Sequence, residues 1–149
     1  MTEREQIRLD IKTRLNSYRE LNAERLQLLD ELQQLEQLMR SPASPNMDGM
    51  PKGGSGPSNP VESLVVKHMT LEERYKAKIE ALAEEQDKIE TLIECLDPTE
   101  RTLARFRYID GLRWEDVCEA INYSWMQTHR LHARLLNKLV DAEMAKRNQ

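Results

Sequence analysis

Residues 111–132 read GLRWEDVCEAINYSWMQTHRLH, and this stretch decides the fold of the C-terminal part of the chain. It contains the whole of one short amphipathic segment, 114–121, and the start of a second, 125–140. The break between them begins at Asn122, a residue that tolerates the left-handed backbone of a tight turn. The pattern therefore predicts two helices joined by a three-residue turn.

Two capping signals extend this prediction. Ser124 and Gln127 form a capping box at the start of the second helix. Upstream, Asp97 is a suitable N-cap and Pro98 suits the first helical position, which predicts a further helix over 98–109. The expected core packs Phe106, Ile109, Leu112, Val117 and Ile121 against Leu131, Leu135 and Leu139. Short helices locked in this way form a helix-turn-helix, whose second helix lies in the DNA major groove.

The distribution of charge favours DNA as the partner of this module. The whole chain has a formal net charge of −4. Residues 125–139 nevertheless contain Arg130, Arg134 and Lys138 and no acidic residue. A local excess of positive charge on an otherwise acidic protein is typical of a phosphate-facing surface.

The segment 96–139, LDPTERTLARFRYIDGLRWEDVCEAINYSWMQTHRLHARLLNKL, resembles region four of sigma factors, which read promoters through a helix-turn-helix. The longer segment 71–139 is similar to small phage proteins of low-GC Gram-positive bacteria. These proteins are related to late-gene transcriptional regulators of the RinA and ArpU kind. The resemblance implies that the chain binds double-stranded DNA and identifies RNA polymerase as a second candidate partner.

The same resemblance assigns roles along the recognition helix. It places three side chains against base edges: Trp125, Met126 and Arg130. It places four beside them or against phosphates: Gln127, His129, Arg134 and Lys138. The cap at Ser124 leaves free backbone donors where a phosphate would lie.

This chain departs from the sigma pattern at three positions. Sigma factors usually have charged residues where Trp125 and Met126 stand, so their sequence preference does not transfer. Arg113 replaces the usual Ser or Thr cap, which weakens that helix start by about 1 kcal/mol.

The Trp125 ring has two candidate positions, against a base or sugar or over the turn beside Tyr123. Trp114 is expected in the core.

Residues 1–40 are predicted to form one coiled-coil helix. Thr2 and Glu5 form a capping box at its start. The apolar residues of one seam position are Ile7, Leu21, Leu28 and Leu35, and those of the other are Ile11, Tyr18, Leu32 and Met39. Arg14 and Arg25 are the two exceptions in this heptad.

Residues 41–60 are predicted to be a flexible linker, because five of the six prolines and four of the five glycines lie there. A second long helix is expected over 61–96, with a capping box of Thr70 and Glu73 at its regular start. Its expected apolar stripe contains Tyr75, Ile79, Leu82, Ile89, Ile93 and Leu96. The partner of this helix is either the first helix, as a hairpin, or a second copy of the chain, and homo-oligomers are expected.

These patterns predict an all-α protein, with long N-terminal coiled-coil helices followed by a sigma region-four-like helix-turn-helix domain at 97–149. The leading hypothesis is a phage-encoded transcriptional regulator. Two alternatives stay open: a DNA-packaging recognition subunit of the small-terminase kind, and a protein-interaction module that binds RNA polymerase without DNA.

Other functional classes have no support in the sequence. It carries no nucleophile motif or glycine-rich phosphate loop, so an enzyme is not expected, nor is a cofactor. His129 and His132 have no third ligand at suitable spacing, so no metal site is predicted. No apolar run is long enough for a membrane span, and the cytoplasm of a bacterial host is the expected location.

Overall fold

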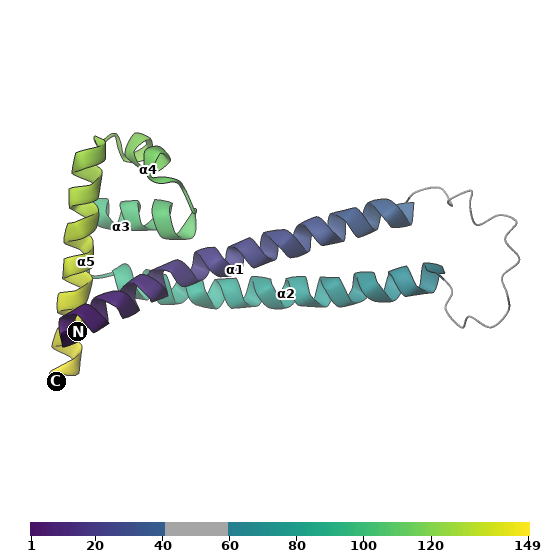
Figure 1. Ribbon diagram of the computed structural model, residues 1–149, viewed down its shortest axis with the longest axis horizontal. Coiled ribbons are helices and arrows are strands. Elements are labelled where there is room, and N and C mark those ends of the chain that lie inside the picture. Colours follow the sequence, from purple (N-terminus) through teal and green to yellow (C-terminus); the bar gives the residue numbers. More distant parts are fainter. Residues whose placement is uncertain (41–59) are drawn as a thin grey trace, which may run out of the picture. The chain divides into compact units, whose positions relative to one another are not determined.

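The computed structural model describes residues 1–40 and 60–149, and every regular element in these residues is helical (Figure 1). In chain order the elements are α1, Glu3–Arg40; α2, Pro60–Ile93; α3, Pro98–Ala104; a π-helical turn, Arg105–Ile109; α4, Trp114–Ile121; and α5, Trp125–Arg147. The predicted all-α class is therefore confirmed. Within the described residues, no helix combines the length and the apolar character that crossing a bilayer requires.

The chain divides into two compact units, and α1 and α2 contribute to both. The first unit combines residues 1–22 with residues 81–149. Its core contains Ile7, Ile11, Leu15, Ile89, Ile93, Leu96, Leu103, Ala104, Tyr108, Val117, Leu131, Leu135, Leu136, Leu139 and Val140. The N-terminal half of α1 thus shares a hydrophobic core with the C-terminal helices.

The second unit, residues 23–80, has a much smaller core among its described residues. The antiparallel segments of α1 and α2 bury only three leucines there, Leu32, Leu35 and Leu71. Polar contacts join the same segments. Arg25 donates to the Tyr75 hydroxyl over 3.2 Å, and Lys78 pairs with Glu24.

The first helix begins as predicted but uses its seam differently. The Thr2 Oγ1 accepts from the Glu5 amide over 3.2 Å, and the Thr2 amide donates to the Glu5 carboxylate over 2.8 Å. Leu15, absent from the predicted heptad, is fully buried, whereas Met39 is exposed. Residues 7, 11, 15 and 18 follow one face of a regular helix, so the packing follows a spacing of about 3.6 residues there rather than a strict heptad.

Two details predicted for the second helix are wrong. The helix begins at Pro60, one residue from the predicted bound of 61, and proline suits the first position of a helix. The capping box expected at Thr70 and Glu73 therefore falls inside the helix. The Thr70 hydroxyl donates to the Val66 carbonyl over 3.0 Å, as a helix-interior threonine does. Ile79, which was expected in the apolar stripe, is exposed. On the same helix, the half-buried Glu85 accepts a hydrogen bond from the Ser17 hydroxyl over 2.8 Å.

The C-terminal boundaries agree with the prediction except at three ends. The second helix stops at Ile93 rather than 96, the third closes with a π-helical turn, and α5 continues to Arg147 rather than 140. Asn122 adopts φ 60°, the left-handed conformation expected of the turn. The predicted linker lies outside the described residues apart from Pro60, which belongs to α2.

The buried position of Leu15 leads to a stability prediction. Leu15→Ala should lower the free energy of unfolding by about 2–5 kcal/mol, because it removes fully buried methyl groups and leaves a cavity. Leu9→Ala is the matched control, since Leu9 is 51% exposed on the same helix, and its cost should stay within about 0.5 kcal/mol. Urea denaturation followed by circular dichroism measures both. Equal losses would contradict the assignment of Leu15 to the core.

Candidate nucleic-acid interface

The start of α5 is held by the predicted capping box. The Gln127 amide donates to Ser124 Oγ over 3.1 Å, and the Ser124 amide donates to Gln127 Oε1 over 3.0 Å. This pair satisfies two backbone donors, while the remaining donors of the first turn stay available at the positive end of the helix dipole. The start of α5 is therefore rigid and can accept an anion.

The two helices of the motif pack through the predicted core. Val117 of α4 and Leu135 of α5 are fully buried, and Ile121 packs against the same cluster. Trp114 also packs against this core, as expected from the sequence. The turn at Asn122 and this shared core fix the angle at which α5 leaves α4.

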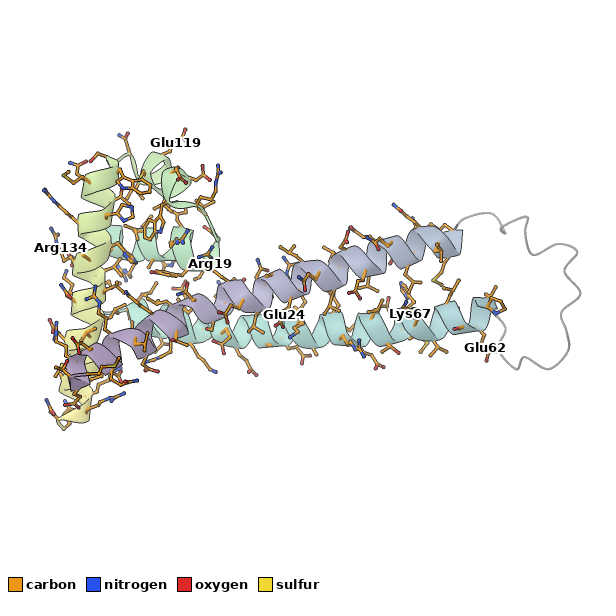
Figure 2. All side chains as sticks on the ribbon, in the orientation of Figure 1. Arg19, Glu24, Glu62, Lys67, Glu119 and Arg134 are labelled. Atoms are coloured by element: carbon orange, nitrogen blue, oxygen red, sulfur yellow. The ribbon has the colours of Figure 1, made fainter. Side chains whose placement is uncertain are left out.

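Four predicted contact residues lie on the exposed face of α5. Trp125 and Met126 in the first turn are 53% and 63% exposed. Arg130 and Arg134 follow, both exposed and four residues apart, so they share one helix face. Figure 2 shows Arg134 on the outer side of α5 and Glu119 above α4, so the two opposite charges lie apart.

His129 is not presented as a phosphate contact. Its ring lies 4.8 Å from the Trp114 ring and 4.3 Å from the Trp125 ring, measured between centroids. Its Nε2 atom is buried and has no hydrogen-bond partner. The histidine therefore supports Trp125 from inside the motif and leaves the outer indole face free. This packing against His129 was not foreseen from the sequence, and the contact of the Trp125 ring with a base or sugar stays a prediction.

His132 belongs to a partly buried polar pair that the sequence did not reveal. Tyr108 of the π-helical turn hydrogen-bonds His132 Nε2, and the Trp114 ring lies 4.7 Å from the imidazole. Burial, followed by the nearby charges of His129, Lys12, Arg107 and Arg8, lowers the pKa of His132 to about 4. Burial raises the pKa of Tyr108 to about 12. At neutral pH the hydroxyl therefore donates to an uncharged ring.

Lys138 is engaged by carboxylates instead of being free for phosphate. Its Nζ donates to Glu100 Oε1 over 2.8 Å and to Asp97 Oδ2 over 3.0 Å. Glu100 is only 1% exposed, so the ammonium compensates a buried negative charge. The hydrogen bonds to Glu100 and Asp97 raise the pKa of Lys138. Lys138 therefore joins α5 to the start of α3 and is not part of the candidate interface.

The remaining chemistry of the module is limited. In residues 1–40 and 60–149, no group of three or more His, Cys, Asp and Glu side chains is placed to hold a metal ion. Cys95 and Cys118 are both free thiols. The candidate interface therefore contains the capped start of α5 and four exposed side chains, Trp125, Met126, Arg130 and Arg134.

The buried His132 predicts a stability change at mildly acidic pH. The folded pKa of about 4 lies below the ordinary 6.5, so the unfolded chain binds more protons between these values. This contribution is fully present above pH 6.5 and is lost as the pH falls toward 4. The free energy of unfolding should drop by about 2 kcal/mol between pH 7 and pH 5 because of His132.

His132→Gln removes the titrating ring and should flatten this part of the pH profile. Urea unfolding at pH 7, 6 and 5 measures the slope, above the range where most carboxylates titrate. His68→Gln is the control, because His68 lies in the second unit and pairs with Glu36. A His132→Gln profile as steep as that of the unmodified protein would be incompatible with a partly buried, uncharged His132.

Comparison of the chain with protein-family models, with curated proteins and with solved structures found no match.

Proposed function

We propose that the C-terminal module binds double-stranded DNA with α5 in the major groove, and that the protein is a phage-encoded transcriptional regulator. The observation that carries the proposal is the exposed face of α5. Arg130 and Arg134 project from it without an acidic residue between Trp125 and Leu139. Arginines on an exposed helix suit both guanine edges and phosphates.

The packing of the module supports the same proposal. A recognition helix has to be held rigidly by elements outside the groove, with its N-terminal turns free. In α5, residues from Leu131 onward supply buried leucines, whereas Trp125 and Met126 are among its most exposed side chains. Arg130 lies between these parts, where a base contact would be well positioned. The sigma region-four resemblance of residues 96–139 supports regulation in particular.

Three alanine variants distinguish contacts with base edges, which depend on the DNA sequence, from contacts with phosphates, which do not. Arg130→Ala should cost about 1–3 kcal/mol on a preferred duplex and much less on random DNA, if the guanidinium contacts a guanine edge. Arg134→Ala should weaken binding to both duplexes and reduce the salt slope by about one, as loss of a phosphate contact does. Lys138→Ala is the control: it should leave the salt slope unchanged and lower the melting temperature, because Glu100 loses its partner.

Titrations at two salt concentrations, on a duplex selected from a random pool and on random DNA, measure these effects. Equal losses on both duplexes for Arg130→Ala would mean that α5 holds DNA without reading it. Absence of DNA binding by the unmodified protein would overturn the proposal and favour the protein-interaction alternative.

We further propose that the second unit associates with another copy of the chain. Its three buried leucines contribute about 1.5–3 kcal/mol each, which is small beside the entropy cost of ordering two helical segments. Large apolar side chains on the same segments are exposed, among them Leu38, Val65, Val66 and Met69. Burial of these residues against a second hairpin would supply the missing apolar contact.

The association proposal is tested on the full chain by light scattering. The unmodified protein should have at least a dimeric mass at tens of micromolar, and Val65→Glu with Met69→Glu should reduce it to the monomer. Gln86→Glu is the control, since Gln86 is exposed at the other end of α2. A monomeric mass for the unmodified protein would overturn the proposal. Between the two DNA-linked alternatives, a dimer favours regulation and a large ring favours packaging.

A further inference from the structure

A second basic strip lies on α1, within the same compact unit as the C-terminal helices. It contains Arg8, Lys12 and Arg19, which are separated by four and seven residues. These spacings place the three side chains on one face of a helix. Figure 2 shows Arg19 on the side of α1 that faces α3. The strip therefore borders the module instead of pointing away from it.

Arg8 continues the basic face of α5 directly. Its Nη1 donates to Asn137 Oδ1 over 2.9 Å. Asn137 is exposed and follows Arg134 by three residues, so Arg8 lies one helical turn beyond Arg134. From Arg130 to Asn137 the axis of α5 rises by about 10 Å. A guanidinium carries five N–H donors, so Arg8 keeps several after this contact.

Arg4 marks one end of the uncompensated strip. Its Nη1 pairs with Asp141 Oδ1 at 2.7 Å, so its charge is already balanced. No ion pair to Arg8, Lys12 or Arg19 is formed by the described residues, 1–40 and 60–149. The three cations are thus available to an external anion.

The neighbours of the strip are also positive. Arg107 of the π-helical turn lies 4.7 Å from the centre of the Trp114 ring and donates to the Leu112 carbonyl over 2.9 Å. Burial, and next the charge of Arg19, lower the pKa of Arg107, while Tyr108 and Glu115 act in the opposite direction. After burial and His129, the charges of Lys12, Arg107 and Arg8 also lower the pKa of His132. Several cations therefore share one region, and an anion bound there would relieve their repulsion.

We propose that Arg8, Lys12 and Arg19 bind the phosphate backbone of the DNA duplex next to the groove that receives α5. From residue 8 to residue 19 the axis of α1 rises by about 16 Å, which corresponds to roughly five base pairs of DNA. A row of cations of this length matches successive phosphates rather than a single small anion. The inference rests on the DNA-binding function proposed above and extends the interface to a helix outside the helix-turn-helix.

Because phosphate contacts carry no sequence information, the strip has a distinct experimental signature. Arg8→Gln, Lys12→Gln and Arg19→Gln combined should weaken binding to selected and random duplexes by the same factor. The slope of log K against log salt concentration should fall by about two to three, since each lost phosphate contact removes about 0.9. Fluorescence anisotropy titrations of the full-length protein on both duplexes, at four salt concentrations, measure the change.

The matched control is Lys88→Gln. Lys88 lies in the same unit and has the same charge, but its exposed side chain pairs with Glu85 on α2. Its slope should equal that of the unmodified protein. The single variant Lys12→Gln tests whether a loss of slope could come from misfolding. Because Lys12 is exposed, this variant should keep the melting temperature of the unmodified protein and lower the salt slope by about one.

Three results would overturn the inference, and they are distinguishable. If Arg130→Ala and Arg134→Ala impair binding while the triple variant keeps its slope, DNA binding stands and the strip is not part of the interface. If the triple variant loses affinity on the selected duplex alone, the strip does not act through phosphates. If the unmodified protein binds neither duplex, the proposed function fails and the inference fails with it.

Discussion

The leucine stripe of α5 has to be buried, and the surrounding helices are arranged to cover it. Leu131, Leu135 and Leu139 recur every four residues, and all three are buried. A single partner helix cannot cover this stripe along its length, so α4 packs against its N-terminal part and α3 packs alongside. The N-terminal half of α1 joins the same core through Ile7 and Ile11. The face that remains uncovered is the face that carries the exposed arginines.

Polar groups inside this unit specify how its helices meet. The carboxylate of Glu100 is buried and is compensated by Lys138, which joins the start of α3 to the middle of α5. Tyr108 and His132 form a second, partly buried polar link between the π-helical turn and α5. Apolar packing tolerates small shifts, whereas these hydrogen bonds require one relative position of the helices. The orientation of α5 therefore depends on side chains that are buried or partly buried.

The exposed part of the candidate interface was predictable because it depends on local spacing. The capping box of Ser124 and Gln127 and the outward position of Met126, Arg130 and Arg134 follow from helix periodicity alone. The neighbours of His129 and Lys138 inside the fold were not predicted. Each lies near the border between the exposed and buried faces, where helix spacing cannot distinguish solvent from a neighbouring element. The rings of Trp114 and Trp125 pack against His129. Asp97 and Glu100, at the start of α3, form ion pairs with Lys138.

The helical class, the capped ends at Thr2, Asp97 and Ser124, the left-handed turn at Asn122 and most of the core could be predicted from the amino-acid sequence. These features depend on residues within one or two turns of each other, where periodicity and capping chemistry are sufficient. The packing of α1 with the C-terminal helices, and the contact of Arg8 with Asn137, 129 residues away, became visible in the folded chain alone. The burial of Glu100 and the partial burial of His132 also depend on the tertiary structure. A contact across such a separation depends on the mutual packing of whole helices, which no local pattern of residues records.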